Sequence, residues 1–342
     1  MPAADYPTTS SERDAWVVRR RGPRHPGDPS QPHAFLRETE PDGREGVADV
    51  WTLFLTNKEC PWRCVMCDLW KATLPESLPP GEIPRQIEAG LGRLGMPPKP
   101  SDRGQGGGQR WIKVYNSGSF FDPAAIPVAD HPAIALQVRG FDRLIVECHP
   151  RLVGDRVMRF LETLRTASHP APPPRLEVAM GLETVHPETL ERLNKRMTVQ
   201  DFQRAARLLR EADIDLRVFL LVRPPFLPAS IAAEWLRRGM ETAFDAGAGV
   251  VSIIPTRLGN GSLEELARAR EFEEPRIADL EQGLEFGLGL RRGRVFADLW
   301  DLARFSRCPR CLPQRRQRLE AMNLRQQLRP PVECDTCGEG GG

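Results

Sequence analysis

The sequence lacks any apolar stretch that could cross a membrane. Its longest apolar runs, such as 218–222 (VFLLV), have the length of a strand, whereas a transmembrane helix needs about 20 apolar residues. The first residues also contain no apolar core of the kind that marks a secretion signal. We therefore expect a cytoplasmic protein without a membrane partner.

A strong net charge is also absent, since the formal net charge is +2 at pH 7. The 342 residues are 40% hydrophobic and 27% charged, which suits one large α/β domain with an appendage. The charge is uneven, however, because residues 291–330 hold 11 Arg against three acidic residues. The basic helix expected over 314–328 is either a surface that contacts RNA or a solvated face of an Arg-rich segment.

Residues 1–46 are rich in Pro, Ser, Arg and Gly and contain the basic run 19–21. Such a composition is typical of a polar, basic arm that is disordered or packs along the main domain, with 16–18 as an apolar anchor. An arm that binds RNA or a partner is the functional alternative.

From residue 47 onward, short apolar strands alternate with amphipathic helices. The helices are expected over 82–94, 155–165, 187–197 and 231–246, with a further one opened by the capping pair Thr198 and Asp201. No hairpin signal separates the strands, so the alternation predicts a parallel sheet with right-handed crossovers, either open or curled into a partial barrel. Six strands are expected, over 50–55, 111–115, 144–147, 176–180, 216–222 and 250–254.

Cysteine is scarce, and its eight copies form one triplet, two CxxC pairs and the lone Cys148. In an intracellular chain this arrangement favours metal binding over disulfides. The triplet CxxxCxxC follows the apolar run 50–55, so its thiolates lie on one loop at a strand end. They can reach different irons of a cubane cluster and leave one iron open, whereas a closed zinc site needs a fourth ligand. The predicted ligands are Cys60, Cys64 and Cys67.

This cysteine loop, CPWRCVMC, resembles the cluster motif of the radical S-adenosylmethionine (SAM) enzymes. The segment 181–198, GLETVHPETLERLNKRMT, is similar to the matching segment of the elongator-catalytic-subunit and methylthiotransferase group. The resemblance covers 47–259 and implies a (β/α)6 partial barrel. It also implies a [4Fe-4S] cluster that cleaves SAM to methionine and a 5′-deoxyadenosyl radical, with an electron donor such as flavodoxin or ferredoxin. The chain then divides into the arm 1–46, the barrel 47–290 and a cysteine-containing extension 291–342.

The resemblance places SAM at the carboxyl ends of the strands, where ligands bind in parallel α/β folds. The second strand is followed by Asn116, Ser117, Gly118 and Ser119, which occupy the place of the family's glycine-rich motif. The backbone of that motif binds the methionyl amine of SAM. The commoner form of that motif has paired glycines and an acidic residue, so loop 116–119 matches the motif in its position and not in its residue types. A glycine with small polar neighbours lets the backbone approach a ligand closely.

Two acidic residues at other strand ends are further candidates for the SAM site. Glu183 ends the fourth strand and, by the resemblance, faces the ribose or carboxylate of SAM. Glu147 ends the third strand and is a second candidate, for SAM or substrate. Either carboxylate is alternatively a helix-cap or ion-pair acid. Met66 stands where the family commonly has an aromatic residue, and we expect it to pack beside the adenine.

Four more residues close these strands. Arg223 and Arg257 follow the fifth and sixth strands, and either guanidinium is a candidate for the SAM carboxylate or an anionic substrate. Cys148 and His149 are either a buried, satisfied pair or additional ligands.

Cys308, Cys311, Cys334 and Cys337 form a CxxC…CxxC array with 22 residues between the pairs. Four thiolates in two pairs match a tetrahedral zinc site and equally match a second iron–sulfur cluster. Auxiliary clusters in many radical SAM enzymes favour the cluster. The missing seven-cysteine pattern of the peptide-modifying subgroup favours zinc, so both alternatives stay open here.

The substrate is open between several classes. Modification of tRNA or a nucleoside is favoured by the basic segment and by the resemblance to tRNA-acting radical SAM enzymes, more loosely including the radical SAM lyase of archaeosine synthesis. Radical modification of a small metabolite or peptide is favoured by the near-neutral net charge. The non-enzymatic alternative is a zinc-stabilised RNA- or protein-binding module with an inactive cluster loop, and the intact cysteine triplet argues against it.

Overall fold

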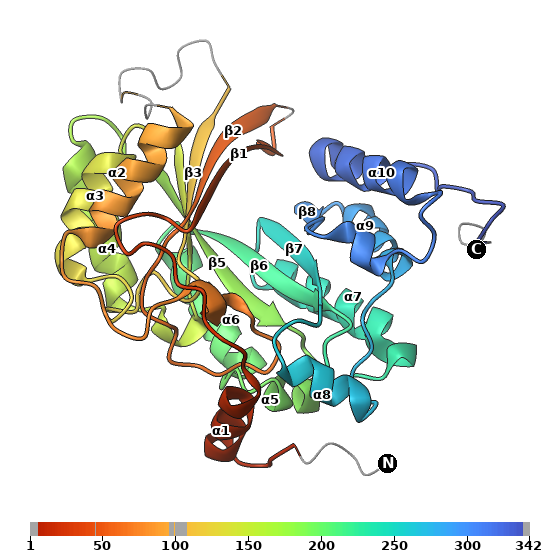
Figure 1. Cartoon of the computed structure of the whole chain (residues 1–342). Coiled ribbons are helices and arrows are strands. Elements are labelled where there is room, and N and C mark those ends of the chain that lie inside the picture. The colour runs from red at the N-terminus through yellow and green to blue at the C-terminus, as the bar shows by residue number, and fades with distance from the viewer. Residues whose placement is uncertain (1–5, 45, 96–98, 100–107, 338–342) are drawn as a thin grey trace.

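A computed structural model describes residues 6–44, 46–95, 99 and 108–337 (Figure 1). Its centre is one eight-stranded sheet in which the strands lie in chain order. The first pair is antiparallel, and every later pair is parallel. The sheet curls into half a barrel, so the predicted partial-barrel fold is confirmed. The strands are β1 (Ala34–Pro41), β2 (Val47–Phe54), β3 (Arg110–Tyr115), β4 (Arg143–Glu147), β5 (Arg175–Glu183), β6 (Asp215–Val222), β7 (Val250–Pro255) and β8 (Arg294–Ala297).

Helices connect the parallel strands and lie outside the curled sheet (Figure 1). Each buries one apolar face, as α6 does with Phe202 and Leu209. Within the described residues, no helix combines the length and the apolar character that a membrane span requires. The helices are α1 (Ser10–Arg20), α2 (Glu82–Leu94), α3 (His131–Val138), α4 (Asp155–Ser168), α5 (Pro187–Arg192), α6 (Val199–Glu211), α7 (Ala229–Asp245), α8 (Ser262–Arg268), α9 (Ile277–Leu290) and α10 (Leu312–Arg325).

All six strands expected from the sequence are present, and a capping box of Thr198 and Asp201 opens α6. The sequence does not predict β1 and β8, because β1 carries charged residues and is exposed or half-buried over its first six residues, and β8 has only four residues. The helix expected over 187–197 ends at Arg192. It stops there because Asn194 and Arg196 adopt left-handed backbone conformations, with φ of 57° and 56°.

The N-terminal arm is folded where it is described. Disorder, one of the states that its composition allows, is therefore wrong for α1 and β1. Trp16 and Val17 of α1 are 2% exposed and pack into an apolar cluster with Val65 and Phe226. β1 pairs along its whole length with β2, which satisfies its backbone on that side.

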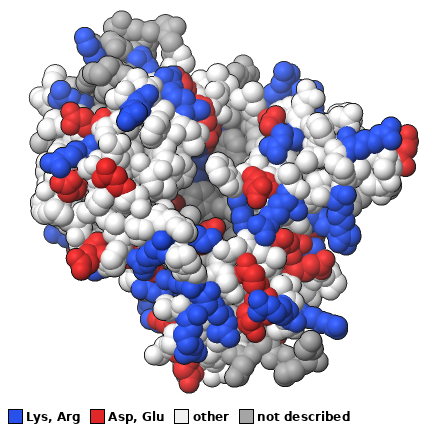
Figure 2. All heavy atoms as spheres, viewed as in Figure 1, with Lys and Arg blue, Asp and Glu red and all other residues white. Residues whose placement is uncertain are grey.

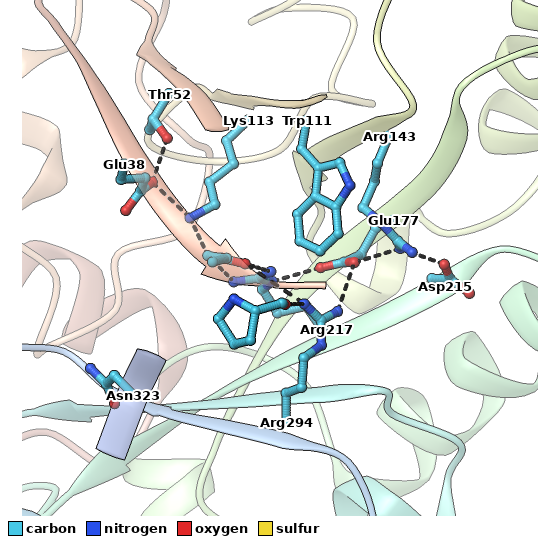
Figure 3. Close-up of polar contacts among 12 residues, drawn as sticks. Glu38, Thr52, Trp111, Lys113, Arg143, Glu177, Asp215, Arg217, Arg294 and Asn323 are labelled. Carbon is cyan, nitrogen blue, oxygen red and sulfur yellow. Dashed lines mark hydrogen bonds and ion pairs between the residues drawn. The ribbon is translucent and has the colours of Figure 1, made fainter. Parts of the chain in front are cut away.

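The inner face of the half barrel carries a network of buried charges (Figure 3). Arg217 is at its centre, with Nε donating to Glu177 (2.6 Å) and Nη2 donating to Glu40 (2.7 Å). Lys113 Nζ lies 2.5 Å from Glu40 and 2.8 Å from Glu38. All of these side chains except Glu38 are at most 6% exposed. An unpaired charge at such depth is strongly destabilising, so the members of the network depend on one another.

This network also connects the two edges of the sheet. In the described part of the chain, no backbone ladder joins β1 to β8. Arg294 of β8 instead donates from Nη1 to the carbonyl oxygen of Pro41 at the end of β1, over 2.7 Å. Burial alone would raise the pKa of Glu40. The positive charges of Arg217 and Lys113 instead hold that pKa well below its usual range.

We expect Arg217→Met to lower the free energy of unfolding by roughly 3–5 kcal/mol, because it leaves Glu40 and Glu177 buried without their guanidinium partner. Denaturant unfolding at pH 7 measures the loss. The matched control is Arg238→Met, which removes an exposed ion pair with Glu234 on α7 and should change stability by at most about 0.5 kcal/mol. Equal effects of the two substitutions would contradict a stabilising network.

The same variant tests the pH dependence that follows from the depressed pKa of Glu40. Its contribution to stability is present above the ordinary carboxyl pKa of 4.5 and is lost as the pH falls below that value. The wild-type protein should therefore lose stability between about pH 5 and pH 3. Arg217→Met should lose less over the same interval, since its Glu40 no longer has the guanidinium that depresses the pKa.

Candidate functional site

The three cysteines of the triplet lie on the loop that follows β2, at the carboxyl end of the barrel. The backbone N–H of Cys67 donates to the carbonyl oxygen of Cys64 over 3.2 Å, which closes a turn between these two residues. The N–H of Val65 donates to the carbonyl oxygen of Leu193 over 3.0 Å. The loop that carries Cys60, Cys64 and Cys67 is therefore tied to the segment that follows α5.

These three thiols suit separate metal atoms better than a single ion. Among the described residues, the side chains grouped closely enough to hold a single ion are the four C-terminal cysteines, and the triplet does not form such a group. Burial raises the pKa of each thiol to about 12, so each sulfur keeps its proton unless a metal cation replaces it. A cluster of several irons offers one iron to each thiolate. The donor set therefore fits the cluster predicted from the sequence.

Gly118 brings the loop after β3 into contact with the cysteine loop. A Cβ atom on Gly118 would lie 3.1 Å from the Cβ atom of Cys60, so a side chain here would press the two loops apart. Ser117 before it adopts a left-handed conformation with φ of 54°. Ser119 after it accepts the N–H of His149 on its hydroxyl oxygen over 3.3 Å.

Asn116, the first residue of this loop, has unused hydrogen-bonding groups. Its side chain is fully buried, and neither amide atom has a partner in the described part of the chain. Leaving a buried amide unpaired costs roughly 1–3 kcal/mol, which a polar ligand would offset. The orphaned amide and the close approach at Gly118 fit a polar ligand held beside the cysteines.

Glu147 at the end of β4 binds the backbone of this same loop. Its Oε2 accepts the N–H of Asn116 over 2.9 Å. Burial raises the pKa of Glu147, and backbone N–H groups of the loop, those of Ser117 and Gly118 included, oppose that rise. The carboxylate therefore holds the loop in place, and a direct contact of Glu147 with SAM stays a prediction.

A buried ion pair lies at the end of β5. Lys195 Nζ is 2.5 Å from Glu183 Oε1, and the two side chains are 11% and 10% exposed. A Cβ atom on Gly181 would lie 2.1 Å from Glu183 Oε1 and 2.5 Å from Lys195 Nζ, so only glycine leaves room for the pair. Glu183 adopts φ of 65° at an irregularity in the β5–β6 pairing. A bend in β5 thus turns the predicted SAM residue toward Lys195.

Lys195 is a site residue that the sequence does not single out. Its positive charge acts on Cys60 and Cys64, lowering their pKa against the effect of burial. Burial opposes its own charge, but Glu183 raises the pKa of Lys195. The sequence feature that could have identified Lys195 is its position in 181–198, the segment that resembles radical SAM enzymes.

Packing explains the surroundings of Met66 and His149, and Cys148 is buried with its thiol donating to the carbonyl oxygen of His149 over 3.3 Å. Met66 lies against the apolar cluster that contains Trp16 and Val65, and its contact with adenine stays a prediction. The His149 ring stacks on Trp62 with centroids 3.7 Å apart. Its Nε2 lies 3.0 Å from a backbone carbonyl, and its Nδ1 accepts a backbone N–H. Burial lowers the pKa of His149 to about 3, so the ring is neutral and both nitrogens are used.

The two arginines at the ends of β6 and β7 have acidic partners. Arg257 Nη2 lies 2.5 Å from Asp298. Arg223 lies 3.4 Å from both Glu273 and Asp279. An anionic ligand at either guanidinium would compete with these carboxylates.

Helix α1 lies over the carboxyl end of the barrel, beside the cysteine loop (Figure 1). Glu59, directly before Cys60, forms ion pairs with Arg21 (2.6 Å), with Arg24 and with Arg63 (3.1 Å). Arg21 and Arg24 belong to the segment that follows α1. The N-terminal arm is thus connected to the first predicted cluster ligand through one buried carboxylate.

The four C-terminal cysteines come together at the start of α10. Cys308 Sγ lies 3.9 Å from Cys334 Sγ, and Cys311 Sγ lies 3.8 Å from Cys337 Sγ. All four sulfur atoms lie within 4.8 Å of one another. Four sulfurs this close can bind a metal.

The basic helix predicted over 314–328 corresponds to α10, but two of its arginines face the interior. Arg315 and Arg318 are 3% and 7% exposed. They lie 3.2 and 3.4 Å from Glu281 of α9, and Arg318 also lies 2.5 Å from Glu285. Contact with RNA is therefore wrong for these two side chains, because they are buried and pair with the buried carboxylate of Glu281.

No family model matches the chain. Among curated proteins, it is similar to the archaeosine synthase subunit beta of Thermococcus kodakarensis, with 25% identity over 48% of this chain and 50% of that protein. The archaeosine synthase subunit beta of Methanosarcina acetivorans is 28% identical over 39% of this chain and 38% of that protein. The chain thus matches half or less of the length of these relatives.

Among solved structures, methylornithine synthase (PylB) has a TM-score of 0.48 at 14% identity, over 73% of this chain and 65% of that chain. Elp3 of Methanocaldococcus infernus has a TM-score of 0.47 at 15% identity, over 71% and 59%. The radical SAM enzyme coproporphyrinogen III oxidase (HemN) of Escherichia coli has a TM-score of 0.42 at 13% identity, over 84% and 56%. All three TM-scores are below 0.5. In sequence the chain is similar to archaeosine synthase subunits, and its neighbours in structure include the radical SAM enzyme HemN.

Proposed function

We propose that this chain is a radical SAM enzyme whose [4Fe-4S] cluster is bound by Cys60, Cys64 and Cys67. The observation that carries the proposal is that three half-buried thiols share the carboxyl end of the barrel with the orphaned amide of Asn116. Gly118 lets the loop of that amide touch the cysteine loop. Three cysteine ligands leave one iron open, and the neighbouring loop offers polar groups to a SAM bound there.

The residues around the cysteines then have separate roles. When bound, the reduced cluster supplies the electron that cleaves SAM to methionine and a 5′-deoxyadenosyl radical. The loop 116–119 binds the methionyl amine and keeps its shape through Glu147. Glu183 and Lys195 offer an acceptor and a donor to the ribose and the carboxylate. Helix α1 covers the cysteine loop and limits the access of water.

Anaerobically purified protein is expected to be brown and to convert SAM to 5′-deoxyadenosine when dithionite is added. Cys64→Ala should abolish the cluster absorption and the reaction, because two cysteines cannot hold the cluster. Chromatography of 5′-deoxyadenosine measures the yield. A flavodoxin or ferredoxin should replace dithionite as the electron donor.

The matched control for this experiment is Cys148→Ala, which removes a buried thiol outside the triplet. It should retain both the cluster absorption and the cleavage of SAM. A wild-type protein that leaves SAM intact after cluster reconstitution would refute the proposed function.

For the substrate, we propose tRNA or one of its nucleosides. Two curated relatives are archaeosine synthase subunits, which supports this class. Lys and Arg side chains also gather on the face of the molecule that carries α1 and α8 (Figure 2). Exposed arginines there include Arg19 on α1 and Arg270 just after α8.

A small metabolite is the second candidate, and one pocket favours it. The pocket has a volume of about 450 Å³ and lies after the end of β6. Its lining includes Phe226, Leu227, Phe272 and Arg270. Both the size and the mixture of aromatic and charged side chains are typical of sites for small organic ligands.

Salt-dependent binding of bulk tRNA distinguishes the two candidates. We expect Arg19→Ala/Arg270→Ala to weaken binding and to reduce the slope of log affinity against log salt by about two, since each phosphate contact contributes about 0.9. The matched control is Arg165→Ala/Arg204→Ala, which removes two exposed arginines from α4 and α6. Absent tRNA binding, or equal effects of both double variants, would favour the small metabolite.

A further inference from the structure

The four C-terminal cysteines have the spacing of ligands to one ion. A tetrahedral site with zinc–sulfur bonds of about 2.3 Å places its sulfur atoms about 3.8 Å apart. Two of the sulfur–sulfur distances are 3.9 Å for Cys308–Cys334 and 3.8 Å for Cys311–Cys337, and all four sulfur atoms lie within 4.8 Å of one another. In an iron–sulfur cluster each thiolate binds a different iron, so the sulfur atoms lie farther apart than around a single ion. We infer that these cysteines hold one zinc ion, which ties α10 across the open edge of the half barrel.

Contacts beside the cysteines keep the two CxxC loops together. Ser306 Oγ accepts the N–H of Cys308 over 3.3 Å and donates to its carbonyl oxygen over 3.0 Å. Arg310 Nη1 donates to the hydroxyl of Thr336 over 3.1 Å, which joins the first loop to the second. Tetrahedral sets of four thiolates select zinc or iron among the common metals. The single-ion spacing favours zinc over a cluster of several irons.

Helix α10 covers the edge strand β8 with two amide side chains. Asn323 accepts the N–H of Ala297 over 2.9 Å and donates to its carbonyl oxygen over 2.8 Å. Gln326 does the same for Val295, over 2.7 and 2.9 Å. Each amide thereby makes the pair of hydrogen bonds that a residue of a further strand would make. The free edge of the sheet is satisfied without another strand.

The same helix spans the gap between the two edges of the sheet. It lies against both β8 and β1, and its Leu319 and Met322 are fully buried in the main core. On its other side, Arg315 and Arg318 neutralise Glu281 of α9. Helix α10 therefore closes the seam that the curled sheet leaves open.

Zinc binding would fix this helix at both ends. Cys311 is the residue that caps the start of α10, while Cys334 and Cys337 follow its end. Among the described residues after the helix, Arg329 and Pro330 are held by Arg318, which donates to their carbonyl oxygens. One ion bound by both cysteine pairs would thus link the start of α10 to the segment that follows its end.

Metal analysis of the triple variant Cys60→Ala/Cys64→Ala/Cys67→Ala tests the metal independently of the proposed reaction. We expect one zinc per chain, no visible absorption and loss of that zinc in a variant that also carries Cys334→Ser/Cys337→Ser. Iron in place of zinc, whether one or four atoms per chain, would overturn the inference, as would a metal-free protein after growth with added zinc. The wild-type protein should hold one zinc in addition to the irons of the triplet, so a failed SAM reaction leaves this outcome unaffected.

Hydrogen exchange tests whether the zinc ties α10 to the edge. In Cys334→Ser/Cys337→Ser, the amides of Val295 and Ala297 should exchange about tenfold faster, because a freed α10 opens more often. Asn323→Leu/Gln326→Leu should accelerate the same two amides while keeping its zinc. Amides of β5, in the middle of the sheet, are the internal reference and should not change. Unchanged exchange at β8 after loss of zinc would show that the ion does not hold the helix.

Discussion

The structure depends on one constraint, which is that a sheet curled into half a barrel has two edge strands. Backbone groups on an edge are costly when buried and attract foreign strands when exposed. In this chain, side chains form hydrogen bonds with backbone groups of both edge strands. Arg294 reaches from β8 to the backbone of Pro41 on β1, and Asn323 and Gln326 pair with the backbone of β8. A long cationic side chain can cross the gap only if it is neutralised there, which explains why Glu40 and Glu177 lie inside the barrel.

The two ends of the barrel use buried charge in different ways. Near the amino ends of the strands, Arg217 contacts both Glu40 and Glu177, and Glu40 is also bound by Lys113. A network with this many bonds is rigid, because losing any member leaves another unpaired. At the carboxyl end, Glu183 and Lys195 form a simple pair. A ligand with an ammonium and a carboxylate, as SAM has in its methionyl part, can exchange partners with such a pair without leaving a charge unpaired.

The sequence predicts what depends on local pattern. The six buried strands are visible because their apolar runs are continuous, and the cysteine loop is visible because three ligands lie within eight residues. The edge strands escape prediction because their inward residues, such as Glu40 and Arg294, are charged.

Contacts that decide the role of a charged side chain are distant in sequence. Arg217 is 177 residues from Glu40, and Arg318 is 33 residues from Glu285. A single sequence therefore identifies Arg315 and Arg318 as a basic surface, although both are buried against acids. Lys195 is easier to interpret than these arginines, although the sequence still does not single it out. It lies in a segment that resembles radical SAM enzymes, and its partner Glu183 is only 12 residues away.

The segments outside the region of family resemblance complete the site as well as the fold. Glu59 joins Arg21 and Arg24 of the N-terminal arm to the residue beside Cys60. Because these pairs are partly buried, moving α1 aside to admit a large substrate would expose Glu59 and disturb the cysteine loop at the same time. The proposed tRNA substrate would therefore approach with α1 in place, and the exposed arginines of this helix, such as Arg19, would lie on the surface that it contacts.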